Sequence, residues 1–147
     1  MKFTFIIDRS KEEEVVITAG EKTELVAQIE ALVCRYNAVD RLMGYLEDEV
    51  RMLKFEDIAC VTVLGGKTCA VATDGKTYRL HMRLYEAESI LPSSFIRINK
   101  STVANETHIL RFVATIGGGI DAVFQGGHRD YVSRRCFSEI KRRLEKR

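Results

Sequence analysis

Residues 95–105, "FIRINKSTVAN", contain the pattern around which the rest of the chain can be organised. Apolar Phe95, Ile96 and Ile98 alternate with polar side chains, which is typical of a half-buried strand. The segment then becomes small and polar and ends at Asn105. Such a strand displays four polar residues together just before a turn, namely Arg97, Asn99, Lys100 and Ser101. These four residues form either an ordinary solvated surface or a binding edge.

Length and composition indicate a soluble globular protein with one domain, or with a small domain and an appendage. The 147 residues are 46% hydrophobic and 30% charged, which is ordinary for a folded chain and unlike a disordered one. No apolar run approaches the roughly 18 residues of a membrane span. The N-terminus is broken too early, by Asp8, for a signal peptide. These features predict a cytoplasmic protein.

The cysteines and histidines do not have the spacing of a metal site. There is no CxxC pair among the cysteines, which are Cys34, Cys60, Cys69 and Cys136. There is no HxxxH or HExxH pattern among the histidines, which are His81, His108 and His128. We therefore expect no metal or other cofactor, and we expect the cysteines to act as small core hydrophobes in a reducing cytosol.

The net charge of +2 conceals an uneven distribution. Residues 1–60 contain 8 Lys and Arg against 13 Asp and Glu, whereas residues 128–147 contain 8 against 3. The basic C-terminal end suggests an anionic partner. A solvated helix face explains the same composition equally well, so charge alone leaves both interpretations open.

Residues 1–40 have the pattern of a β-β-α unit. "KFTFIID" at 2–8 and "EEVVITA" at 13–19 are short β-like runs separated by charged residues. After Gly20, apolar side chains recur at helical spacing and predict one face made of Leu25, Ile29, Leu32, Val33 and Tyr36. So small a unit buries little apolar surface alone, and we expect it to dock on the rest of the chain or on another copy.

The rest of the chain has the pattern of short strands with tight turns. Strands are predicted around Leu42–Leu46 and at 58–64, with turns at Gly65–Gly66 and Asp74–Gly75. Two or three further strands follow residue 107, with reversals at the glycines 117–119 and 126–127. The expected fold class is mainly β with short helices.

Two helices complete this β-rich part. One is predicted over residues 84–91, where Leu84, Ala87, Glu88 and Leu91 are in a helical register, and it ends there because Pro92 cannot continue a helix. The other begins after Ser133, whose hydroxyl can cap it, and its inward-facing residues are Phe137, Ile140 and Leu144.

Motifs for enzyme chemistry are absent from the sequence. "GGKT" at 65–68 has the ending of a phosphate-binding loop, but that motif requires a glycine where Val61 stands. "GGG" at 117–119 is followed by a strand, not by a helix. No nucleophile with its base, carboxylate pair or metal cluster can be named, so we predict neither catalysis nor a small-molecule substrate.

Five short elements, over residues 50–147, resemble in order and spacing the LytTR family of bacterial DNA-binding domains. The family pattern has D-I before a strand, an L-x-x-x-E-x-x-L-like helix, F-x-R followed by [K/R]-S, a nearby Asn, and S-R-R opening the last helix. The matching elements are Asp57–Ile58, Leu84…Glu88…Leu91, Phe95–Arg97, Lys100–Ser101 with Asn105, and Ser133–Arg135.

This resemblance implies an elongated β fold of small sheets that binds double-stranded DNA through loops, not through a recognition helix. In domains of this family, loops enter successive major grooves of the DNA, with an intervening contact near the minor groove. The loop residues carried over by position are Lys67, Lys100 and Arg135. Arg135 can donate two hydrogen bonds to guanine O6 and N7, and Lys100 can do so less directionally.

Other residues of the same segments suit phosphate contact, which fixes register without reading sequence: Arg97, Ser101, Ser133 and Arg134. Asn99 stands where many members have His or Ser, so a base or phosphate contact differs there. The alternative interpretation of Lys67 is that it is only a lysine of the hairpin turn. Arg134 and Arg135 oppose the dipole of the helix they begin, which favours a functional role. Asn105 is expected to bond local backbone in a turn.

The sequence thus predicts a bacterial, sequence-specific DNA-binding transcriptional regulator. Residues 1–42 form the N-terminal β-β-α segment, which is too short for a receiver domain and is expected to make a homodimer or dock a partner. Residues 43–147 form the LytTR-like domain. A small membrane protein that restrains the regulator is implied by resemblance alone. The alternatives are a protein-interaction module, and a single-stranded RNA binder, which would need exposed aromatic residues among the basic ones.

Overall fold

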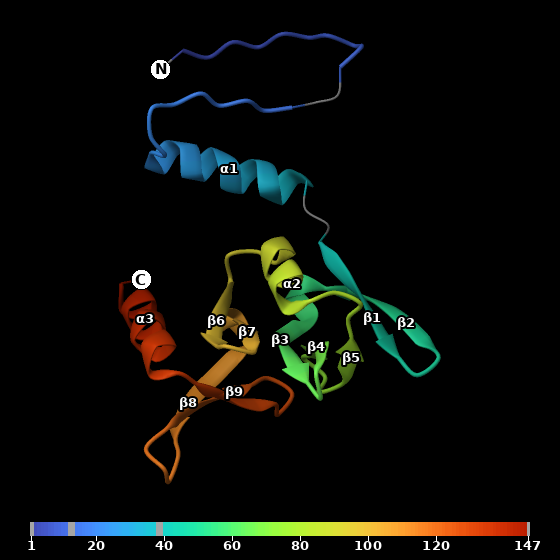
Figure 1. Cartoon of the computed structure of the whole chain (residues 1–147), viewed down its shortest axis with the longest axis vertical. Helices are drawn as coiled ribbons and strands as arrows, with labels where there is room; N and C mark the ends of the chain where they lie inside the picture. Colours follow the sequence, from blue (N-terminus) through green and yellow to red (C-terminus); the bar gives the residue numbers. More distant parts are fainter. Residues whose placement is uncertain (1, 12–13, 38–39, 147) are drawn as a thin grey trace. The chain divides into compact units, whose positions relative to one another are not determined.

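The structure is a computed structural model that describes residues 2–11, 14–37 and 40–146. The chain forms two compact units, residues 1–38 and residues 39–147, which Figure 1 colours in blue and from teal to red. This division lies slightly before the expected boundary at residue 42. The reason is that Leu42 belongs to the first strand of the second unit and is buried in its core.

In the N-terminal unit, helix α1 (Glu24–Asn37) confirms the predicted helix. The helix shares an apolar pocket with the preceding segment, lined by Val15, Ile17, Val26, Ile29 and Val33. Leu25 and Leu32 lie outside that pocket and are exposed by 44% and 59%. The helix therefore packs only part of its predicted apolar face within this unit.

The two β-like runs of the N-terminal unit are not strands in the structure. Across residues 2–8 and 14–19 the chain has no strand assigned, and residues 9–11 form a turn between these two runs (Figure 1). They are joined near Asp8, whose carboxylate accepts hydrogen bonds from the backbone and the hydroxyl of Ser10 at 3.0 and 2.6 Å. Two strands without a third are marginal in water, which explains why the alternating sequence does not produce a ladder by itself.

The second unit contains ten strands in two antiparallel sheets, as far as its described residues go. The larger sheet has the order β2-β1-β5-β4-β3-β7-β6 and the smaller one β10-β9-β8. The strands are β1 (Arg41–Leu46), β2 (Glu49–Lys54), β3 (Ile58–Leu64), β4 (Lys67–Ala72), β5 (Thr77–Arg79), β6 (Phe95–Asn99), β7 (Thr102–Asn105), β8 (Ile109–Ala114), β9 (Ile120–Phe124) and β10 (Arg129–Val132). The predicted mainly β class is confirmed.

Two α-helices and two short 3-10 helices accompany the sheets. The α-helices are α2 (Leu84–Ile90) and α3 (Arg134–Glu145), and both were expected from the sequence. The 3-10 helices are η1 (Phe55–Asp57) and η2 (Glu106–His108). Each 3-10 helix directly precedes a strand, η1 before β3 and η2 before β8.

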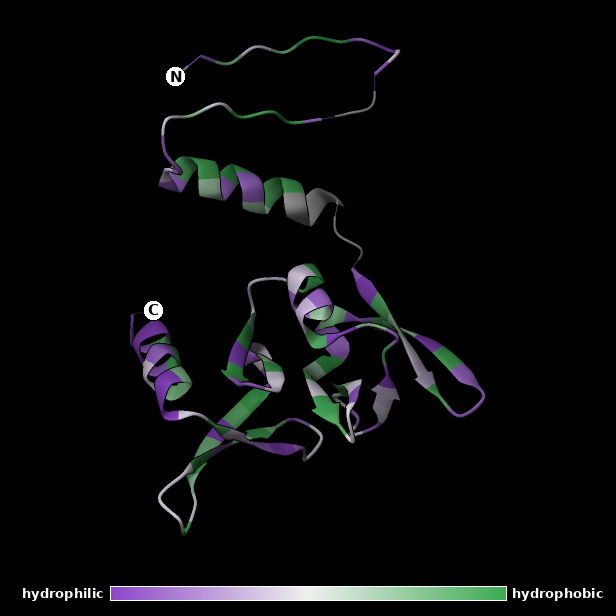
Figure 2. Ribbon diagram, viewed as in Figure 1, coloured by the Kyte–Doolittle hydropathy of each residue, from purple (hydrophilic) through white to green (hydrophobic). Residues whose placement is uncertain are grey.

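Strand β3 is buried on both faces and organises two hydrophobic clusters. Val61 belongs to the cluster that includes Ala87 and Leu91 from the α2 region. Its neighbour Cys60 belongs to the other cluster, which includes Phe124 of β9 and Ile140 of α3. A strand covered on both sides needs a nearly continuous apolar run, and "IACVTVL" provides one. By contrast, β1 and β2 contain both hydrophilic and hydrophobic residues (Figure 2).

The glycine-containing turns confirm the predicted hairpins. Gly65 and Gly66 join β3 to β4 with φ of 57° and 77°, the left-handed region that a two-residue hairpin turn requires. Gly126, with φ of 94°, lies so close to another turn that a Cβ there would be 2.6 Å from the carbonyl oxygen of Thr73. The β4–β5 and β9–β10 turns, on different sheets, therefore touch through backbone.

We expect Gly126→Ala to destabilise the chain by about 1–3 kcal/mol, because a side chain at positive φ is strained and this one also meets the Thr73 carbonyl. Urea unfolding measures the change. Gly117→Ala is the matched control, since a Cβ there meets no atom within 4 Å. Equal stability of the two variants would contradict the close packing of these turns.

Candidate nucleic-acid interface

Three turns that contain most of the predicted contact residues are held on neighbouring strand ends. They are residues 65–67 between β3 and β4, residues 99–101 between β6 and β7, and residues 133–135 between β10 and α3. The Val63 N–H donates to the carbonyl of Ser101 at 3.0 Å, which joins the end of β3 to the second turn. The Ser133 N–H donates to the carbonyl of Ile98 at 2.9 Å, which joins the third turn to β6.

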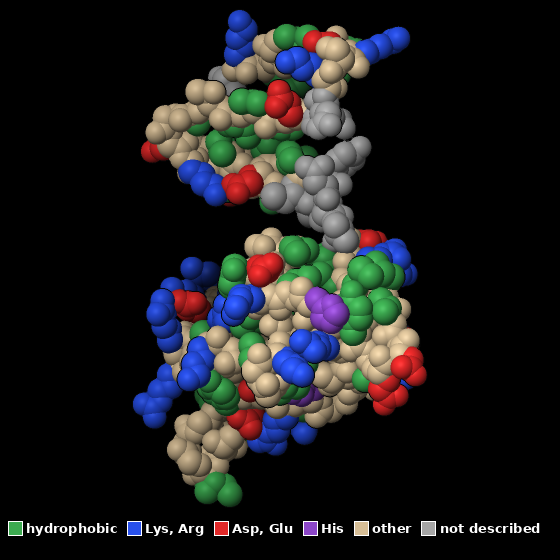
Figure 3. Space-filling view, turned by 45° about the vertical axis from the view of Figure 1, so that its right-hand side comes forward, with side chains coloured by type: hydrophobic (Ala, Val, Ile, Leu, Met, Phe, Trp, Pro, Cys, Tyr) green, Lys and Arg blue, Asp and Glu red, His purple; other side chains and the backbone are tan. Residues whose placement is uncertain are grey.

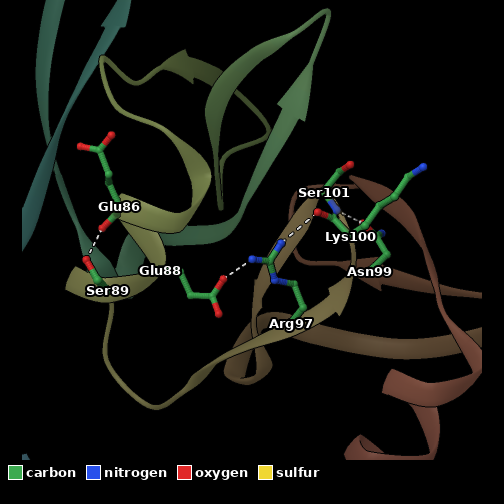
Figure 4. A network of polar contacts seen from close by, with 7 residues as sticks. All are labelled: Glu86, Glu88, Ser89, Arg97, Asn99, Lys100 and Ser101. Atoms are coloured by element: carbon green, nitrogen blue, oxygen red, sulfur yellow. Dashed lines mark hydrogen bonds and ion pairs between the residues drawn. The ribbon is translucent and has the colours of Figure 1, made fainter.

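The turn at 99–101 is shaped by the side chain of Asn99, which is only 2% exposed. Its Nδ2 donates to the carbonyl of Tyr131 on β10 at 2.8 Å. Its Oδ1 accepts from the Ser101 N–H at 2.8 Å (Figure 4). Both ends of the amide are used inside the protein. The sequence analysis placed Asn99 on the contact surface. In the structure its side chain is instead buried, and its amide holds the turn.

Arg97 braces the same turn from the side of α2. One guanidinium nitrogen donates to the carbonyl of Lys100 at 3.0 Å, and another forms an ion pair with Glu88 (Figure 4). In the same view the Lys100 side chain extends away from Arg97 and from the strands. The turn therefore presents the Lys100 ammonium while Arg97 holds its backbone.

A buried polar connection between the sheets was not anticipated from the sequence. The hydroxyl of Thr102 on β7 donates to Asp130 of β10 at 2.6 Å and lies 2.7 Å from the hydroxyl of Thr62 on β3. Burial, with a contribution from the Asp130 charge, raises the pKa of the nearby Cys60 thiol. Cys60 is thus a neutral core residue, as the sequence predicted.

The third turn begins α3 in the predicted way. The Ser133 hydroxyl accepts from the N–H of Cys136 at 3.2 Å and caps the helix, while Arg134 and Arg135 are exposed in its first turn. Of the three residues expected to face inward, Ile140 is buried and Phe137 is half-buried. Leu144 is 41% exposed, because it lies near the end of the helix.

Asn105 bonds backbone, as predicted, but it reaches further than one local turn. Its Oδ1 accepts from the Thr107 N–H at 3.2 Å, which caps η2. Its Nδ2 donates to the carbonyl of Ile58 at 3.1 Å, at the start of β3. Asn105 is 3% exposed, so it stabilises the fold instead of forming part of the candidate surface.

A basic groove of about 780 Å³ lies between the first two turns and the segment that follows β5. It brings together three predicted residues, Lys67, Arg97 and Lys100. It is also lined by Arg79 and Arg83, which the sequence analysis did not single out. Figure 3 shows several Lys and Arg side chains on one face of the second unit.

Comparisons with known proteins agree with this architecture. Residues 48–145 match the family model described as the LytTr DNA-binding domain. The match covers about two thirds of the 147 residues, and the chain belongs to the LytTR DNA-binding domain family. The chain is also similar to uncharacterised HTH-type transcriptional regulators of Staphylococcus aureus strains NCTC 8325 and MSSA476. Each is 29% identical to this chain over 147 residues, and the alignment covers 98% of both proteins.

A solved structure supports the fold. The LytTr DNA-binding domain of a Bacillus cereus protein superimposes with a TM-score of 0.63 at 23% identity, covering 71% of this chain and 96% of that one.

Among the described residues, no helix is long and apolar enough to cross a membrane. The same residues contain no group of three or more His, Cys, Asp or Glu placed to hold a metal ion.

Asn99→Ala is expected to lower stability by about 1–3 kcal/mol, because the Tyr131 carbonyl and the Ser101 N–H lose their buried partner. Amide hydrogen exchange at Ser101 should accelerate at the same time, which NMR can follow. Ser101→Ala serves as the control, since it keeps this backbone bond. Unchanged exchange at Ser101 would show that the amide does not hold the turn.

Proposed function

We propose that this chain is a transcriptional regulator that binds double-stranded DNA sequence-specifically through the turns at 65–67, 99–101 and 133–135. Membership of a DNA-binding domain family supports DNA as the partner. The observation that carries the proposal is the convergence of these three cationic turns, through the backbone bonds from Val63 to Ser101 and from Ser133 to Ile98.

The polar residues in and beside the three turns have different roles in this proposal. Lys67, Lys100 and Arg135 reach base edges in the major groove, where Arg135 can hold guanine with two hydrogen bonds. Ser101, Ser133 and Arg134 contact phosphates and fix the register. Arg97 and Asn99 are positioning residues, because their polar atoms hold the turn at 99–101.

Loops, not a helix pair, are the reading elements in this proposal. A helix-turn-helix joins two helices through a turn of about three to four residues. Here α2 and α3 are separated in the chain by β6 to β10. The basic first turn of α3 reaches DNA as the end of a loop, next to the 99–101 turn, and we infer no catalytic role for the chain.

We further propose that the N-terminal unit, which the sequence placed at residues 1–42 and which ends before β1, makes the regulator a homodimer. The segment that precedes α1 carries apolar side chains that are more than 70% exposed, including Phe3, Phe5, Ile6, Ile7 and Val16. Large exposed apolar areas mark interaction surfaces, and a second copy supplies the strands that this unit lacks. As a DNA-bound regulator the protein works in the cytoplasm; a restraining membrane protein remains an implication of resemblance.

Lys100→Ala and Arg135→Ala should each weaken binding to duplex DNA from the protein's own promoter region by about 1–3 kcal/mol and relax base preference. Fluorescence anisotropy across salt concentrations measures the affinity, and the same measurement with base-substituted duplexes gives the base preference. Lys54→Ala is the matched control, because Lys54 is exposed on β2, at the opposite edge of the large sheet from β6.

Two outcomes would count against the proposal in different ways. If both variants bind like the wild type while Lys54→Ala also does, the contact residues are misassigned. If the wild-type protein ignores duplex DNA at low salt, the chain is not a DNA-binding regulator, and a protein-interaction module becomes the better interpretation.

Removal of residues 1–40 should convert a dimer into a folded monomer, because the second unit begins with β1 at Arg41 and has its own core. Light scattering gives the mass, and circular dichroism checks that the sheets persist. A truncated chain that still dimerises would place the dimer interface elsewhere.

A further inference from the structure

The segment after β5 carries a second row of basic side chains. Along "RLHMR" at 79–83, Arg79, His81 and Arg83 are exposed, whereas Leu80 is buried and Met82 is half-buried. The apolar residues anchor the segment, and the other three side chains remain at the surface. All five residues line the basic groove.

This row lies directly beside the first candidate turn. In the ladder between β4 and β5, Cys69 is paired with Arg79. The Leu80 N–H then donates to the carbonyl of Thr68 at 2.8 Å, so the pairing continues past the end of β5. Continuation of this register brings His81 to the level of Lys67, and the row forms a wall of the groove that also contains Lys100.

The row is held in place by contacts that leave its charges accessible. The His81 ring stacks on the Tyr45 ring of β1, with centroids 3.8 Å apart and planes 7° from parallel. The backbone N–H of Arg83 donates to Glu86 at 3.4 Å, at the start of α2. These contacts involve a ring and a backbone group, not the guanidinium groups.

The groove has the charge of a surface that faces a polyanion. Five cations and one carboxylate, Glu86, are among its lining residues. Within the part of the chain that the structure describes, four of these cations have no ion pair or side-chain hydrogen bond, namely Lys67, Arg79, Arg83 and Lys100. Closely spaced cations without internal partners repel each other, and bound phosphates relieve that repulsion.

We propose that residues 79–83 form a phosphate ledge, which holds the sugar–phosphate backbone of the duplex beside the turns at 65–67 and 99–101. The inference rests on the proposed function and extends its contact surface to Arg79 and Arg83. The ledge fixes register and adds affinity, but it does not read sequence. An open groove that is continuous with two DNA-facing turns suits an extended backbone better than a small phosphorylated ligand, which needs an enclosed site.

The test uses the full chain with Arg79→Gln, Arg83→Gln and the double variant. Arg111→Gln is the matched control, since Arg111 is exposed on β8 and does not line the groove. Anisotropy is measured with a promoter duplex and with a scrambled duplex, between about 50 and 200 mM salt. Arg79→Lys with Arg83→Lys keeps the charge and should restore binding. Thermal unfolding confirms that the variants fold.

Each lost phosphate contact should reduce the slope of log K against log salt by about 0.9, so the double glutamine variant should lose about 1.8. The affinities for the promoter duplex and the scrambled duplex should fall by the same factor, so base preference stays unchanged. A wild-type slope and affinity in the double variant would overturn the ledge and leave the proposed function standing. Loss of base preference at an unchanged slope would also overturn it. Failure of the wild type to bind any duplex would overturn both.

Discussion

The buried side-chain amide of Asn99 is the constraint on which the candidate surface depends. It connects the 99–101 turn of the large sheet to the Tyr131 carbonyl of the small sheet. An unpaired polar group at this depth costs about 1–3 kcal/mol, so the turn and β10 stay together. The Thr102–Asp130 bond and the Ser133–Ile98 bond cross the same junction. A polar junction inside an otherwise apolar packing therefore fixes where α3 begins relative to β6.

This arrangement separates the polar residues that hold the 99–101 turn from those that, in the proposed function, contact DNA. Arg97 uses its guanidinium on Glu88 and on the Lys100 carbonyl, which leaves the Lys100 side chain to extend outward. A turn that is ordered before binding loses less conformational freedom when a partner arrives. In the proposed function, the backbone of this turn is therefore ordered before DNA binds, and only the side chains at the surface lose freedom on binding.

Local patterns predicted much of the fold, because they depend on neighbouring residues. The strand at 58–64, the Gly65–Gly66 and Asp74–Gly75 turns and the Ser133 cap were all predicted from the sequence. The position of Asn99 was not. Simple alternation puts it on the polar side of β6, but a register shift between Arg97 and Asn99 turns it inward. Such a shift is decided by the partner strand.

Long-range pairing accounts for the other differences. Thr62, Thr102 and Asp130 are polar residues scattered over three strands, and only the fold shows that they meet. The row at 79–83 has a visible signal, the alternation of basic and apolar side chains, but it gains meaning only beside Lys67. The N-terminal runs alternate like strands, yet they lack a third strand to pair with in the described residues.

The central claim is that the turns at 65–67 and 99–101 face DNA. Acetylation of lysines by acetic anhydride, with and without saturating promoter duplex and followed by mass spectrometry, tests it most directly. Our account predicts that DNA slows the modification of Lys67 and Lys100 and leaves Lys54 unchanged. Equal reaction rates of Lys67 and Lys100 in the free and the DNA-bound protein would contradict it.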